Sequence, residues 1–176
     1  MSESALFKRA SARLALMGVM SALIAVATMI AIPMPPPLSA ITLAPVVIFV
    51  TSILMGPWIG LVASAIGSGI GFLAGASIGT IAVPPAFLYV FLVGIVIARA
   101  PMGFMVGILR KVNEVAAMVD GVVTETIIFF VADWYLFGLS LAIISGLGTL
   151  VDLIYVPITY VILKGLRKAL HTTYLL

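Results

Sequence analysis

The sequence predicts an all-α membrane protein, a polytopic bundle of six transmembrane helices with both termini in the cytoplasm. Hydrophobic residues make up 64% of the 176 residues and charged residues only 9%, whereas soluble domains carry about 25% charged residues. Apolar runs longer than about 18 residues recur along the chain, as expected of membrane-spanning helices. The basic residues gather in three clusters, which sets the orientation derived below.

The first three predicted spans occupy the N-terminal half of the chain. The first covers about residues 14–32, and the small-residue triplet "AVA" lies inside it rather than after it, so it is interpreted as a retained helix and not as a signal peptide. The connector "PMPPPLSA" (33–40) holds four prolines, which exclude a helix and favour extended polyproline geometry. A shorter second span, about 41–54, stops at the Gly-Pro break in "MGPW", and the third covers about 59–81.

The last three predicted spans complete a single membrane domain over residues 1–176. "VPP" opens the fourth span, about 84–98, which is followed by the interfacial stretch "RAPMGFMVGILRK". The fifth and sixth spans cover about 112–137 and 141–163. No soluble domain and no internal repeat is recognised.

The distribution of Lys and Arg predicts the orientation, because cytoplasmic loops are enriched in these residues. With six spans, all nine basic residues fall on one side of the membrane and none on the other. We therefore expect both termini to be cytoplasmic. The three clusters are Lys8, Arg9 and Arg13; Arg99, Arg110 and Lys111; and Lys164, Arg167 and Lys168.

Small residues mark two helix faces. A glycine stands at every fourth position of the third span, at Gly67, Gly71, Gly75 and Gly79. In lipid, such spacing lets two helices approach closely, and we expect packing within the bundle in preference to a face for another subunit or a ligand. The first span carries a second small-residue face, for which either internal packing or a partner is possible. Its members are Ala15, Gly18, Ser21, Ala22 and Ala25.

Four acidic residues lie at membrane depth: Asp120, Glu125, Asp133 and Asp152. Each costs about 2.5–3.5 kcal/mol on insertion scales, so buried acids are candidates for function. The six-span reading places no basic residue in the outer half of the membrane. These acids are therefore expected to be protonated, hydrogen-bonded, or matched by a ligand or cation.

Aromatic residues gather toward the same outer side and include Phe87, Tyr89, Trp134, Tyr135 and Tyr155. They fit either an interfacial aromatic belt or a pocket in which rings stack on a planar ligand while acids take its donors. The bias toward acids favours a neutral or cationic ligand that is rich in hydrogen-bond donors.

Several classes of function are disfavoured by absent residues. The chain has no cysteine and no phosphate-binding loop of the Gly-x-x-x-x-Gly-Lys-Ser/Thr type, so it does not hydrolyse ATP by the usual route. Its single histidine, His171, lies in the C-terminal tail. We expect no enzyme activity, catalytic residue, cofactor, metal site or nucleic-acid partner.

Three stretches together resemble the substrate-binding S components of energy-coupling-factor vitamin transporters. They are the alanine-rich first helix "ARLALMGVMSALIAVAT", the block "ITLAPVVIFVTSILMGPWIGLVASAIGSGIGFLAG", and the last helix "LVDLIYVPITYVILKGLRK". The connector is also similar to that of biotin-type members. Leu43 and Ala44 follow Thr42 where those members have glutamine, so biotin is not assigned.

The resemblance implies a subunit of the prokaryotic cell membrane that captures a vitamin-like molecule from outside. It implies docking, through Ala15, Gly18, Ala22 and Ala25, on a membrane coupling protein driven by two cytoplasmic ATPases. The loop 33–40 would then gate the pocket. The candidate substrate-binding residues are Thr42, Phe87, Tyr89, Glu125, Asp133, Trp134, Tyr135, Asp152 and Tyr155.

Two alternatives remain open from the sequence. A small secondary transporter or channel could use Glu125 and Asp152 as proton or cation sites. A purely structural subunit of a membrane assembly would need none of the four acids.

Overall fold

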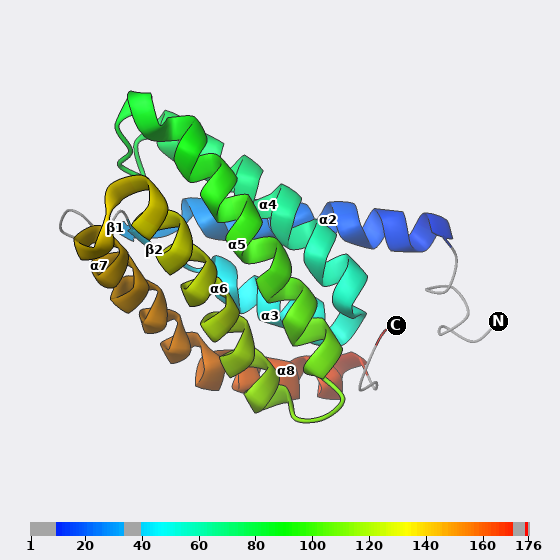
Figure 1. The fold of residues 1–176 in the computed structure, drawn as a ribbon. Helices are drawn as coiled ribbons and strands as arrows, with labels where there is room; N and C mark the ends of the chain where they lie inside the picture. The colour runs from blue at the N-terminus through cyan, green and yellow to red at the C-terminus, as the bar shows by residue number, and fades with distance from the viewer. Residues whose placement is uncertain (1–9, 34–39, 171–174, 176) are drawn as a thin grey trace.

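The fold is that of a computed structural model, which describes residues 10–33, 40–170 and 175. Figure 1 shows helices packed side by side, with a short hairpin at one end of the bundle. The basic residues Lys8 and Arg9, the connector residues 34–39 and His171 lie outside the described residues.

The first helix, α2 (Ala10–Met29), is followed by a two-stranded hairpin rather than by more helix. Strands β1 (Ala31–Pro33) and β2 (Ala40–Thr42) pair antiparallel, with Ala31 opposite Thr42. The residue before a proline is biased away from helical geometry, which explains why Ile32, placed at the end of the first span by the sequence, is extended instead. The described ends of the proline-rich connector are therefore strands.

The next helices, α3 (Ala44–Met55) and α4 (Pro57–Ile78), meet at Gly56, whose φ of 94° favours glycine. Pro57 then starts α4, at a position where its missing N–H has no helical partner to lose. With 12 residues, α3 is about 18 Å long and shorter than the roughly 30 Å hydrocarbon core. The second predicted span is therefore a helix, and a shorter one than the other predicted spans.

Helices α5 (Leu88–Leu109) and α6 (Glu114–Phe137) form an antiparallel pair, with the turn η1 (Pro85–Phe87) leading into α5. Asn113 caps α6, since its side-chain oxygen accepts hydrogen bonds from the N–H groups of Val115 and Ala116. The sequence ended the fourth span at residue 98, which is wrong: α5 continues through Pro101 to Leu109. Prolines are tolerated within membrane helices where neighbours satisfy the freed backbone groups.

The longer α5 changes the interpretation of Arg99. This residue lies within the helix and is buried, so it is not part of a cytoplasmic loop. The expectation that all nine basic residues lie on one side of the membrane is therefore wrong for Arg99. Arg110 and Arg167 do lie at one end of the bundle, where Arg110 donates to the carbonyl of Ile53 in the last turn of α3 and Arg167 pairs with Glu114 at the start of α6.

The sixth predicted span is bent. It comprises α7 (Leu139–Leu150), the 3-10 turn η2 (Val151–Ile154) and α8 (Tyr155–Leu170), and Figure 1 shows α8 leaving the line of α7. Pro157 has no N–H to donate to the carbonyl four residues earlier, which weakens the helix at that turn. The bend places Asp152 between two helices of different direction.

Five helical segments within the described part of the chain are long and apolar enough to cross a membrane. The expectation of an all-α membrane bundle is thereby confirmed. The five segments are Ala10–Met29, Pro57–Ile78, Pro85–Leu109, Glu114–Phe137 and Leu139–Ala169.

The four regularly spaced glycines of the third predicted span fall into two pairs with different roles. A Cβ on Gly67 would lie 2.5 Å from the carbonyl oxygen of Ser21, and one on Gly71 would lie 2.5 Å from that of Ala25, so both glycines pack against the backbone of α2. Gly75 instead accepts hydrogen bonds from Thr80 and Ile81, and Gly79, with a φ of 81°, ends α4. The first two glycines thus pack α4 against α2, and the last two terminate α4.

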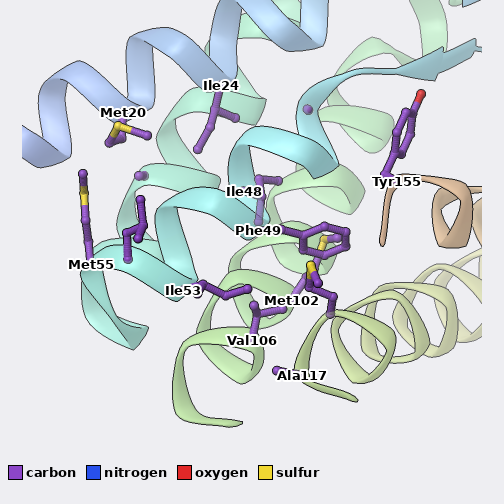
Figure 2. Close-up of a cluster of buried hydrophobic side chains, with 14 of the residues drawn as sticks. Met20, Ile24, Ile48, Phe49, Ile53, Met55, Met102, Val106, Ala117 and Tyr155 are labelled. Atoms are coloured by element: carbon purple, nitrogen blue, oxygen red, sulfur yellow. The ribbon is translucent and has the colours of Figure 1, made fainter. Parts of the chain in front are cut away.

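A core of buried hydrophobic side chains joins the helices (Figure 2), and its members on α5 and α6 come from the half of each helix that includes Met102, Val106, Ala117 and Val122. In a membrane its stability comes mainly from close contact, because lipid tails are as apolar as these side chains. The core leaves the other half of α5 and α6 free to form a polar site. Core members include Met20, Ile24, Ile48, Phe49, Ile53, Met102, Val106, Ala117, Met118 and Val122.

Candidate functional site

A cavity of about 150 Å³ lies between α5, α6, α7 and β2, with further walls from α2 and α4. Each helix contributes residues spaced by three or four positions, which places them on one helical face. On α5 these are Phe91, Ile95 and Arg99. On α6 they are Glu125, Phe129 and Asp133, and on α7 the series ends at Asp152 in η2.

The antiparallel arrangement of α5 and α6 divides the cavity into levels about 6 Å apart, which is the rise of four helical residues. Since Arg99 pairs with Glu125, we expect Ile95 to lie at the level of Phe129, and Phe91 one turn further along, near Asp133 and Phe137. We call the level of Ile95 and Phe129 the apolar layer. Ile41, Phe72 and Ile144 add apolar surface on the other walls.

The level of the ion pair, which we call the polar floor, consists of Thr42, Arg99, Glu125 and Asp152. Arg99 Nε donates to Glu125 Oε1 over 3.1 Å, and Arg99 Nη2 donates to Thr42 Oγ1 over 3.0 Å. Asp152 interacts electrostatically with both Glu125 and Arg99, and its side chain also lies within hydrogen-bonding reach of Glu125. The floor therefore ties β2, α5, α6 and the bend of the sixth span to one guanidinium group.

Two atoms of the polar floor lack a partner among the residues that the structure describes. They are Arg99 Nη1, a donor, and Glu125 Oε2, an acceptor. Glu125 is only 1% exposed, and a buried polar atom without a hydrogen bond costs about 1–3 kcal/mol. The floor is therefore suited to a ligand group that supplies the missing bonds.

The level of Asp133 is also polar on one side. Asp133 accepts a short hydrogen bond from the hydroxyl of Ser145 on α7, and both residues line the cavity. Below them Thr149 of α7 donates to Thr126 of α6 over 3.0 Å. These two contacts hold α7 against α6 and close this side of the cavity.

The candidate ligand residues fall into two groups. Thr42, Glu125, Asp133 and Asp152 line the cavity. Tyr155 is buried in the core next to Asp152 and is not part of the wall.

The other four aromatic candidates do not line the cavity. Phe87 contacts Phe137 edge-on, Trp134 packs beside Phe130, and Tyr89 and Tyr135 are 74% and 90% exposed. The aromatic surface of the cavity comes instead from Phe72, Phe91 and Phe129.

Arg99 is the principal residue that sequence reasoning missed. The expectation that no basic residue would neutralise the buried acids is wrong, because Arg99 pairs directly with Glu125. A signal was present, since the stretch "MGFMVGIL" after Pro101 is as apolar as the span before it. A predicted helix that continued past Pro101 would have included Arg99.

Three of the four candidate docking residues are exposed on α2, namely Ala15, Gly18 and Ala22. A Cβ on Gly18 would have no neighbour within 4 Å. Ala25 is 8% exposed and faces α4 near Gly71, so it belongs to internal packing. Among the described residues, no group of three or more His, Cys, Asp or Glu side chains is placed to hold a metal ion.

The fold and the site define a multi-pass helical membrane protein that encloses a small, partly polar cavity between its spans. The family model of the ECF-type riboflavin transporter S component matches residues 9–168, nearly the whole chain. The chain therefore belongs to this family, and it is a substrate-binding subunit of an energy-coupling-factor transporter. No curated protein and no solved structure gives a significant match.

Proposed function

We propose that this subunit binds riboflavin on the outer side of a prokaryotic cell membrane and delivers it to an ATP-driven importer. The family match supports riboflavin as the ligand. Within the chain, the support comes from one observation: a polar floor with an unpartnered donor and acceptor lies beneath an apolar, aromatic layer. Riboflavin combines a polar edge, a flat apolar ring system and a hydroxylated chain, which are the groups that such a cavity accommodates.

The direct test is to express the chain alone, purify it in detergent and examine it for bound small molecules by mass spectrometry. We expect riboflavin to co-purify, and added riboflavin to lose its fluorescence on binding to protein freed of ligand. A preparation that contains no flavin and does not quench added riboflavin would contradict the proposal.

The proposed partner surface is the exposed side of α2, formed by Ala15, Gly18 and Ala22. Small residues allow a second helix to approach the backbone closely, which suits a membrane coupling protein that works with two cytoplasmic ATPases. Both termini are proposed to be cytoplasmic. The hairpin β1–β2, which contributes Ile41 and Thr42 to the cavity, is proposed to control entry of the ligand.

The secondary-transporter alternative is less well supported, because Glu125 already has Arg99 as its counter-ion. It makes a separate prediction that can be tested in liposomes. The chain alone would then carry out gradient-driven uptake that Glu125→Gln abolishes. We expect uptake only when the coupling protein, the ATPases and ATP are present.

A further inference from the structure

The unpartnered atoms of the polar floor belong to one joined pair of side chains. Arg99 and Glu125 are fixed relative to each other by the 3.1 Å contact between Nε and Oε1. Thr42 fixes the guanidinium further through Nη2. What remains is one donor, Arg99 Nη1, and one acceptor, Glu125 Oε2, both without a partner among the described residues.

We infer that Arg99 and Glu125 together form hydrogen bonds to the imide edge of a flat heterocycle. The ring lies in the cavity with that edge against the two side chains. Glu125 Oε2 accepts the imide N–H, and Arg99 Nη1 donates to an adjacent carbonyl oxygen. This inference rests on the proposed function, in which the heterocycle is the ring system of riboflavin. It assigns Arg99 and Glu125 as the residues that determine specificity.

The positions of the apolar lining residues support this orientation of the ring. Above the floor, Ile95 and Phe129 form the apolar layer, with Phe72 on another wall. A flavin ring that enters with its imide edge first places its apolar rings beside these side chains. The reverse orientation would set a hydrocarbon edge against the ion pair and leave both atoms without hydrogen bonds, which is unfavourable for buried polar groups.

An imide fits the pair better than a carboxylate or phosphate does. An anionic group would satisfy Arg99 but would bring a negative charge against Glu125, its ion-pair partner in the floor. An imide carries an N–H between two carbonyl groups, so it offers a donor and an acceptor side by side without net charge.

The test compares riboflavin with an analogue methylated at the imide nitrogen, using the purified wild-type subunit. Because a site built to bond a ligand N–H rejects the analogue that lacks it, we expect the analogue to bind about 100-fold more weakly. Equal affinity for the two flavins would overturn the inference while leaving riboflavin binding intact. Absence of binding to riboflavin itself would overturn the proposed function and the inference together.

A variant separates a lost hydrogen bond from a simple steric clash. Glu125→Gln keeps a carbonyl oxygen for Arg99 and exchanges the free acceptor for an amide N–H, which opposes the imide N–H. We expect riboflavin to bind about 100-fold more weakly to this variant, with discrimination between the two flavins reduced to about threefold or less. Discrimination that persists in the variant would show that the methyl group is rejected elsewhere, which overturns the inference.

Asp120→Asn serves as the matched control, because Asp120 is an acid of the same helix that does not line the cavity. It should keep the full wild-type discrimination. If Glu125→Gln does not fold, riboflavin labelled with ¹⁵N at the imide position provides a readout on the wild type. A downfield shift of the imide proton on binding is expected, and an imide proton that still exchanges freely with water would overturn the inference.

Discussion

At the scale of single residues, Gly71 and Gly18 give a matched pair, since one is packed against backbone and the other is free. A Cβ on Gly71 would lie 2.5 Å from the carbonyl oxygen of Ala25, whereas one on Gly18 meets nothing within 4 Å. Gly71→Ala should therefore destabilise the subunit by about 1–3 kcal/mol through overpacking. Gly18→Ala should be neutral or slightly stabilising, because alanine favours a helix. Thermal unfolding in detergent measures both, and equal melting temperatures would contradict the close contact.

The ion pair of Arg99 and Glu125 allows stability to be separated from ligand binding. Removing one partner of a buried pair leaves an uncompensated charge and typically costs about 3–5 kcal/mol. Arg99→Met alone should therefore unfold much more readily than the wild type. The double variant Arg99→Met with Glu125→Leu should recover much of that loss and still fail to bind riboflavin. Thermal melts and flavin quenching on the three proteins check this, and binding by the double variant would exclude the pair from the site.

The residues of the site were only partly predictable from the sequence. The depth of Glu125, Asp133 and Asp152 follows from counting along apolar segments, and all three line the cavity. Pairing of Glu125 with Arg99 depends on how two helices are aligned, over a separation of 26 residues. Helical periodicity carries no information about that alignment. For the same reason the sequence could not decide which aromatic residues face inward.

At the scale of helices and strands, α7 is the wall best suited to move. Its only buried residues are Ala142 and Gly146, and it lies between Gly138, with a φ of 89°, and the turn η2. The cavity of about 150 Å³ is smaller than the 300–1,000 Å³ typical of ligand pockets. We therefore expect α7 to move away from α6 when riboflavin enters.

A disulfide tests this movement cleanly, because the chain has no cysteine of its own. Thr126 of α6 and Thr149 of α7 have hydroxyl oxygens 3.0 Å apart, which suits a bridge between Thr126→Cys and Thr149→Cys. In the oxidised form we expect riboflavin to associate at least about tenfold more slowly, with recovery on reduction. The reduced double variant controls for the substitutions themselves. Equal association rates in both forms would show that α7 stays in place.

Proline explains most of the differences between predicted and observed elements. Pro33 favours strand before the connector, Pro101 is accommodated inside α5, and Pro157 accompanies the bend that separates α7 from α8. The same residue type thus ends one helix, continues another and bends a third. Which outcome occurs depends on whether neighbouring groups satisfy the freed carbonyl, and that is a property of the packed bundle rather than of the local sequence.

At the scale of the whole molecule, the all-α membrane bundle was predictable because composition and long apolar runs leave few alternatives. The membrane orientation is predicted from the basic residues. Because Arg99 lies in the cavity and not in a loop, eight of the nine basic residues remain as support for that prediction. Arg110 and Arg167 retain their place at one end of the bundle, through bonds to Ile53 and Glu114.

The proposed docking on a coupling protein belongs to this scale and predicts different effects for substitutions on the two faces of α2. Ala22→Leu, on the exposed face, should weaken assembly with the coupling protein and ATPases by about tenfold or more, because it separates closely packed helices. Riboflavin binding by the isolated subunit should be unchanged. Co-purification of the complex and flavin quenching measure the two properties, and parallel loss of both would contradict separate docking and binding surfaces.

Two further substitutions complete that experiment. Ala116→Leu places the same side chain at an exposed alanine of α6 and should assemble normally. Ala25→Leu, directed at the buried face near Gly71, should lower the melting temperature of the subunit itself.

The contact of Gly67 and Gly71 with the backbone of α2 has a mechanical consequence. Because the two glycines lie directly against the backbone of α2, α2 and α4 are expected to shift as one rigid body. That body carries Gly18 and Ala22 on its outside, and Thr28 and Phe72 on the wall of the cavity. A protein that docks on the outside of α2 would therefore act directly on a wall of the cavity, and we expect this to release the proposed ligand without a relay of intermediate side chains.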